Sequence, residues 1–74
     1  MSWNYRILER RDQNGDRIYA IHEVYYNDKN KPVAASITPS LIIGNSVADL
    51  LIECFNFSKA FLRPVLNWED ISKQ

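Results

Sequence analysis

The sequence predicts an α+β fold in which a three-stranded antiparallel sheet is covered by one helix. Two turn signals, "QNGD" at 13–16 and "NDKNKP" at 27–32, divide the first half of the chain into three runs of strand-forming residues. A longer segment with helical spacing of its apolar residues follows, at about 46–62. Alternating runs joined by short turns are typical of an antiparallel meander, and an amphipathic helix is the usual cover for its apolar face.

The strands are expected at about 3–11, 18–26 and 32–38. Asn14-Gly15 favours a two-residue type I′ turn, because both central residues of that turn need positive φ. With this turn, Arg6 lies opposite Glu23 and Asp12 lies opposite Arg17 on one face. A slip of one residue would break both ion pairs, so the sequence favours this register. In the second turn, Asn30 is expected to take the left-handed conformation.

The same register predicts which side chains share the inner face of the sheet. In the third strand it sets Val33 opposite Val24, Ala35 opposite His22 and Ile37 opposite Ala20. The expected inner face consists of Trp3, Tyr5, Ile7, Ala20, His22, Val24, Tyr26, Val33, Ala35 and Ile37.

The helix is expected to cover this inner face. Ser46 followed by Asp49 is a variant of the capping box, with the carboxylate near the positive end of the helix. The apolar stripe that would face the sheet consists of Val47, Leu50, Leu51, Cys54, Phe55, Ser58, Phe61 and Leu62. Cys54 is therefore interpreted as a small core residue. After Pro64, the chain is expected to form a short strand or a tail that packs Trp68 down, with no partner that the sequence identifies.

Composition limits the possible functions. The chain has 74 residues, enough for a single domain over 1–74, and its nine basic and nine acidic residues cancel. This balance gives no general electrostatic attraction to nucleic acid or to an anionic membrane. One cysteine and one histidine provide neither a disulfide framework nor a zinc site, and no cofactor is expected. With no secretory signal and no apolar run long enough for a bilayer, the cytoplasm is the expected location.

His22 is the residue for which a catalytic role has to be considered. As a general base it would need a nucleophile or an orienting carboxylate nearby, whereas its expected neighbours on the inner face are Ile7 and Ala35. The sequence favours a structural imidazole, hydrogen-bonded to Tyr5, Tyr26 or backbone. An enzyme with His22 as base is kept as a further alternative, and no catalytic residue is predicted.

The feature that points most clearly to function is an excess of apolar residues. Some are expected on the solvent face of the sheet and others in a loop, and contiguous exposed apolar residues mark contact surfaces. We therefore expect a non-catalytic protein-interaction module that binds itself, as a homodimer, or another protein. The expected interface consists of Leu8, Tyr19, Ile21, Tyr25, Leu41, Ile42 and Ile43. Alternatively, the loop 41–43 plugs the open end of the sheet.

A nucleic-acid contact is the main alternative function. Four arginines near the first turn, together with tyrosines on the same face, could bind phosphates and stack on bases. The residues of this alternative are Arg6, Arg10, Arg11 and Arg17.

Four short motifs in the sequence resemble a pattern found in other proteins. They are N-Y-R at 4–6, I-H-E-V-Y-Y at 21–26, K-P-V-A at 31–34 and P-V-L at 64–66. With them the chain resembles a group of small, uncharacterised bacterial proteins, a resemblance that implies no activity. The chain departs from the group's pattern at Asn30, where a glycine is usual, and over 38–46, which is apolar instead of acidic. The order of strands and helix is also similar to small antitoxin domains of the HicB kind and to phage-encoded inhibitors, which implies a binding or regulatory role.

Overall fold

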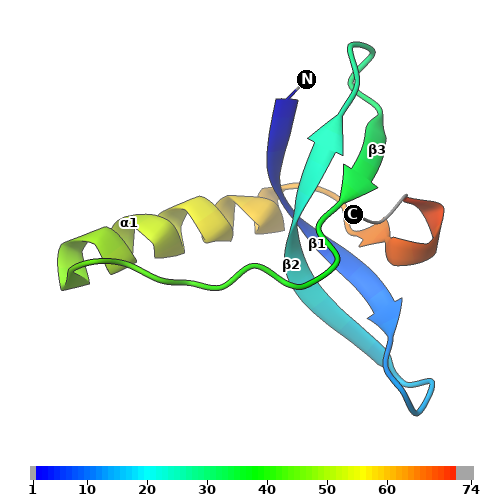
Figure 1. Ribbon diagram of the computed structural model, residues 1–74, viewed down its shortest axis with the longest axis horizontal. Coiled ribbons are helices and arrows are strands. Elements are labelled where there is room, and N and C mark those ends of the chain that lie inside the picture. The colour runs from blue at the N-terminus through cyan, green and yellow to red at the C-terminus, as the bar shows by residue number, and fades with distance from the viewer. Residues whose placement is uncertain (1, 72–74) are drawn as a thin grey trace.

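The computed structural model describes residues 2–71, and its architecture is α+β as the sequence predicts (Figure 1). The strands of its curled sheet are β1 (Ser2–Arg11), β2 (Arg17–Tyr26), β3 (Pro32–Ala35) and β4 (Leu66–Asn67). The helix α1 (Val47–Ser58) continues into a 3₁₀ turn, η1 (Lys59–Leu62), and a second 3₁₀ turn, η2 (Trp68–Asp70), follows β4. None of the helices among the described residues is long and apolar enough to cross a membrane.

The sheet is mixed, with strand order β3-β2-β1-β4. The first three strands form the predicted antiparallel meander with β2 in its middle. The short C-terminal strand adds a fourth, which pairs parallel to β1 through Leu8–Leu66 and Glu9–Asn67. The third strand is shorter than the predicted 32–38, because its ladder with β2 ends at Ala35.

The register between β1 and β2 differs by one residue from the predicted register. Arg6 pairs with His22, and Tyr5, not Arg6, pairs with Glu23. Arg17 pairs with Arg11 instead of Asp12. The predicted cross-strand ion pairs are therefore wrong.

Asp12 is the physical reason for this difference. Its carboxylate oxygen Oδ1 accepts the backbone N–H groups of Asn14 and Asp16, both at 2.9 Å. The backbone N–H of Asp12 also donates to the carbonyl of Asp16. Gly15 alone has a positive φ in this turn, 83°, so the turn is longer than a type I′ turn and shifts the pairing.

The second turn repeats this arrangement. The side-chain oxygen of Asn27 accepts the N–H groups of Lys29 and Lys31, and Asn30 has a φ of 60°. The left-handed conformation predicted for Asn30 is confirmed. The pairing that follows is Val24–Ala35, Tyr25–Ala34 and Tyr26–Pro32, with an irregularity between Tyr25 and Tyr26. The predicted pairs of Val33, Ala35 and Ile37 are wrong by two residues. The loop is one residue longer than predicted, and the irregularity between Tyr25 and Tyr26 adds the second residue.

The shift in register exchanges the two faces of β1. On β2, His22, Val24 and Tyr26 are buried together, as predicted. On β1 the buried residues of that face are Arg6 and Leu8, since a one-residue slip moves every side chain to the opposite face. Leu8 was expected at the surface, but it is 0 % exposed and belongs to the core.

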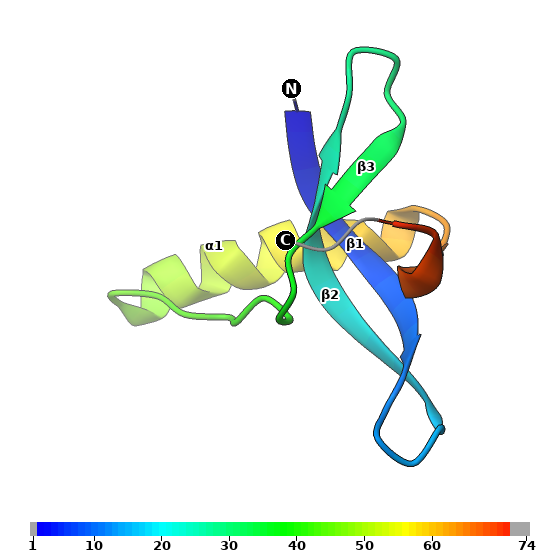
Figure 2. The ribbon, with the colours of Figure 1, turned by 45° about the vertical axis from the view of Figure 1, so that its right-hand side comes forward.

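The two faces of the sheet have different covers (Figure 2). The core face is closed by the C-terminal segment: Ile71 is buried against the cluster, and Leu66 and Trp68 pack at its edge. The members of this cluster are Leu8, Val24, Tyr26, Ala35 and Ile71. On the opposite face the helix packs on the sheet through Phe57, whose ring centroid lies 4.3 Å from that of Tyr5.

The helix begins where the sequence predicts. Ser46 is its N-cap, and the Ser46 hydroxyl accepts the backbone N–H of Asp49 at 3.0 Å. Its orientation differs from the prediction, because Phe57 is the buried residue of α1 and Ala60 that of η1. The first turns of α1 extend past the edge of the sheet (Figure 1).

Candidate functional site

Most of the apolar stripe of the helix is exposed to solvent instead of packing on the sheet. Its most exposed members are Val47, at 85 %, and Leu62, at 84 %. We call the exposed residues that follow helical spacing along this side the outward helix face. They are Val47, Leu51, Phe55, Ser58 and Leu62.

The side of the helix that faces β1 carries Phe57 and, around it, polar residues. A cavity of about 410 Å³ between the helix and β1 is lined by Glu53, Asn56, Lys59 and Arg63, together with Trp3, Asn4 and Tyr5. The predicted orientation, with the apolar stripe on the sheet, is therefore wrong. Helical periodicity defines which residues share a stripe, but it does not define which surface covers the stripe.

Cys54 lies beside the outward helix face and is exposed as a free thiol. The prediction that it is a core residue depended on the helix turning its stripe toward the sheet. Because the stripe faces outward, Cys54 faces outward with it.

The loop before the helix brings a second set of apolar residues to the surface. Leu41, Ile42 and Ile43 are all exposed, so within this chain they do not plug the sheet. Gly44 allows the loop to lie directly against the helix, because a Cβ atom at this position would be only 2.4 Å from the backbone nitrogen of Leu50. The loop and the helix therefore present their apolar residues from adjoining segments (Figure 1).

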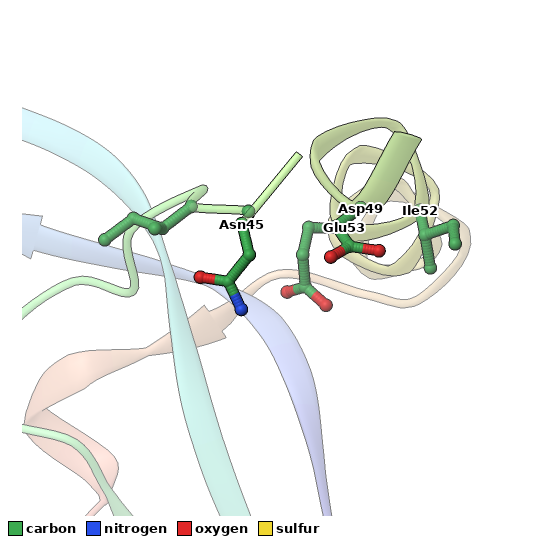
Figure 3. A pocket seen from close by; sticks show the side chains of 6 residues that line it. Asn45, Asp49, Ile52 and Glu53 are labelled. Carbon is green, nitrogen blue, oxygen red and sulfur yellow. The ribbon is translucent and has the colours of Figure 1, made fainter. Parts of the chain in front are cut away.

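A pocket of about 250 Å³ with both polar and apolar lining residues lies between this loop and the first turns of α1. Figure 3 shows Asn45 from the loop and Asp49, Ile52 and Glu53 from the helix around it. Among residues 2–71, no group of three or more His, Cys, Asp or Glu side chains is arranged to hold a metal ion.

The remaining predicted interface residues separate in the structure. Tyr19 and Ile21 line an apolar groove of about 280 Å³ with Ile7, Ala20, Phe61 and Val65. Tyr25 is half-buried, and its hydroxyl donates to Glu23 at 3.1 Å. Leu8 lies on the other face of the sheet and is a core residue. The sequence did not place the outward helix face or Phe61 at the surface, since it assigned the helix to the core, and it gave no role to Val65, which it placed in the strand or tail after Pro64.

The four arginines of the nucleic-acid alternative do not form one surface. Arg6 is buried, Arg10 stacks over the ring of Trp68 at 4.5 Å, and Arg11 donates to the carbonyl of Gly15. Arg17 forms an ion pair with Glu9, with 2.6 Å between Nε and Oε1. Each guanidinium is thus engaged within the chain, and their positions give no support to a common phosphate contact.

His22 lies in the core and is 0 % exposed. Its Nδ1–H donates to the carbonyl of Ser36 at 2.9 Å, and its Nε2 has no hydrogen-bond partner. Its ring lies 5.0 Å from that of Trp68. The imidazole is hydrogen-bonded to backbone, as the structural interpretation predicts, and no substrate can reach it in this arrangement.

Burial lowers the pKa of His22 below its ordinary value of 6.5; the hydrogen bond to Ser36 opposes this and the charge of Arg10 adds to it. Below about pH 6.5 the unfolded chain therefore binds a proton that the folded chain does not. We expect the free energy of unfolding to fall as the pH drops from about 6.5 toward the folded-state pKa, by at most about 1.4 kcal/mol per pH unit. Urea unfolding between pH 5.5 and 8 measures this slope.

The His22→Gln variant is the control for this prediction, because His22 is the chain's single histidine. The variant is expected to be less stable at every pH but to lose the slope near pH 6. If the slope persisted unchanged in His22→Gln, another group would be its origin.

Comparison with protein-family models, with curated proteins and with solved structures finds no match to this chain. The resemblance to small bacterial proteins therefore stays a prediction, and the function has to be argued from the geometry.

Proposed function

We propose that this chain is a small, non-catalytic protein-interaction module that works as a homodimer, with the outward helix face at the centre of the contact. The orientation of α1 is the observation that carries this proposal, since the helix turns its apolar stripe to solvent. Soluble monomers rarely expose contiguous apolar patches larger than a few hundred Å². The proposal assigns the module to the cytoplasm, where an exposed thiol such as that of Cys54 stays reduced.

The size of the exposed surface supports a second copy as the partner. The chain has an accessible surface of 5428 Å², whereas a compact monomer of 8.7 kDa is expected to have about 4,700 Å². The excess is close to the roughly 800 Å² that each partner buries in an interface of standard size. The radius of gyration of 13.0 Å likewise exceeds the value of about 11 Å expected for a compact domain of this length.

The helix dipoles favour an antiparallel pairing of the two helices. In an antiparallel pair the positive N-terminal end of each helix lies beside the negative C-terminal end of its partner. A parallel pair would set like ends of the two dipoles together. A two-fold axis then makes the same surface on both copies self-complementary.

The association state tests the proposal directly. We expect light scattering at micromolar concentration to give twice the mass of one chain, and the melting temperature to rise with protein concentration. Leu51→Arg combined with Phe55→Arg should convert the protein to a folded monomer, because each change places a charge at the centre of the contact. Val33→Arg is the matched control, since Val33 lies in β3, away from the helix.

The single cysteine tests the antiparallel geometry. Val47 and Leu62 mark the ends of the outward helix face, so the two-fold axis of an antiparallel pair passes near residues 54–55. We expect a short bis-maleimide to link two chains efficiently through Cys54. A Cys54→Ser chain that carries Thr38→Cys should give little linked product, because Thr38 lies in the segment after β3.

These outcomes separate the parts of the proposal. A dimer that is not linked through Cys54 would support self-association but contradict the antiparallel pairing of the helices. A folded monomer at all concentrations, unchanged by the double arginine substitution, would contradict the homodimer.

A further inference from the structure

Arg6 is a buried cation in the middle of β1, where it pairs with His22. Only 8 % of its surface is exposed. Its Nη1 donates to the hydroxyl oxygen of Tyr26 and its Nη2 donates to the carbonyl of Pro64, both at 2.7 Å. The Tyr26 hydroxyl in turn donates to Oδ1 of Asn4 at 2.7 Å. Two hydrogen bonds therefore hold the guanidinium, and a third orients the Tyr26 hydroxyl that accepts one of them.

The charge of Arg6 has no counter-charge within the described part of the chain. Its hydrogen-bond partners are a hydroxyl and a carbonyl, both neutral, and its Nε has no partner at all. The ion pair found among residues 2–71 joins Arg17 to Glu9. Charges that a fold buries are normally paired, because removing an ion from water costs several kcal/mol. An anion bound from solution would supply the counter-charge that Arg6 lacks within residues 2–71.

A cavity of about 270 Å³ adjoins Arg6. It is lined by Ser2, Asn4, Arg6, Tyr26, Asn30 and Arg63. Two of these residues are arginines, none is acidic, and the others carry hydroxyl or amide groups. Asn30 is fixed in position by its left-handed backbone in the β2–β3 turn. Arg63, at the end of η1, is exposed and forms the rim.

We propose that this cavity binds a small oxyanion, the phosphate or carboxylate group of a small molecule, between Arg6 and Arg63. The guanidinium suits both groups, because each Nη carries a second N–H beside the one that Tyr26 or Pro64 accepts and can donate it to an oxygen of the anion. The amide and hydroxyl donors of the lining complete the shell of an anion. The site shares no residue with the outward helix face: its residues lie on β1, at the end of β2, on the β2–β3 turn and just after η1.

The test uses the full chain and three sodium salts at equal ionic strength: inorganic phosphate, acetate and chloride. We expect the melting temperature to rise saturably with phosphate, with acetate, or with both, relative to chloride. A response to phosphate alone assigns the site to phosphate groups, and a response to acetate alone assigns it to carboxylates. The amide-type ¹⁵N–¹H signal of Arg6 Nε should shift along the same binding curve.

Arg63→Gln should weaken the apparent affinity for the anion that raises the melting temperature, phosphate or acetate, at least tenfold. It should leave the fold intact, because Arg63 is at the exposed rim. Arg11→Gln is the matched control: Arg11 is also an exposed arginine, but it contacts the carbonyl of Gly15 in its own turn. It should leave the binding curve unchanged. Arg6→Gln removes a buried residue and can fail to fold, so the test does not depend on it. Identical responses to all three salts, or equal losses in Arg63→Gln and Arg11→Gln, would overturn the proposal.

Discussion

Replacing Leu8 with alanine will lower the free energy of unfolding by about 3–5 kcal/mol, the range for a fully buried leucine. Leu8 is 0 % exposed and packs in the cluster with Val24 and Ile71. Truncation removes its contacts and leaves a cavity between the sheet and the C-terminal segment, and a small domain has little stability to lose. Urea unfolding followed by tryptophan fluorescence measures the change.

Leu62→Ala is the matched control, since it makes the same chemical change at an exposed position. In a single chain it should alter the free energy of unfolding by no more than about 0.5 kcal/mol. The measurement has to be made in dilute protein, because the outward helix face is the proposed dimer contact. The order expected from sequence alone is the reverse, with Leu62 in the core and Leu8 in solvent. A larger loss for Leu62→Ala would therefore support the sequence-based arrangement and contradict the structure.

The faces of the sheet show what a sequence pattern can and cannot define. Alternation along β2 correctly predicts that His22, Val24 and Tyr26 are buried together, because period two is a property of the strand itself. The faces of β1 depend in addition on the turn that joins it to β2. The predicted register was based on Asn14-Gly15 and a type I′ turn, and the side chain of Asp12 was not considered. An aspartate or asparagine at the start of a turn commonly accepts backbone N–H groups of that turn. Asn27 in the second turn gives the same signal.

The helix shows a second limit. Its N-terminus was predictable because the Ser46 cap is a local interaction. Its orientation was not, because an apolar stripe can be covered by its own sheet or by another chain. The sheet face that the helix was predicted to cover is covered instead by Trp68 and Ile71. Those residues come from a segment too short to show periodicity.

The anion cavity was missed for a related reason. The predicted register gave Arg6 a partner, Glu23, so its charge required no further explanation. In the structure Glu23 pairs with Tyr5 in the ladder, and Arg6 turns to the core face. A buried charge without a counter-charge can be recognised only after the register is known.

Replacing Ile71 with alanine is the second change with a large expected effect, a loss of about 2–4 kcal/mol in the free energy of unfolding. Ile71 is 5 % exposed and is the last described residue of the segment that closes the core face. Its loss removes packing on Leu8 and Val24 and loosens the segment that holds Trp68 against His22. Ile52→Ala, on the exposed side of α1, is the matched control and should cost less than about 0.5 kcal/mol in dilute protein.

The environment of His22 gives this prediction a second measurement. If Ile71→Ala lets water reach the imidazole, the burial that lowers the pKa of His22 is reduced. The decrease in stability below pH 6.5 should then be smaller in the variant than in the parent chain. A variant as stable as the parent, with the same dependence on pH, would show that the C-terminal segment does not close the core. The buried state of His22 would then need another cause.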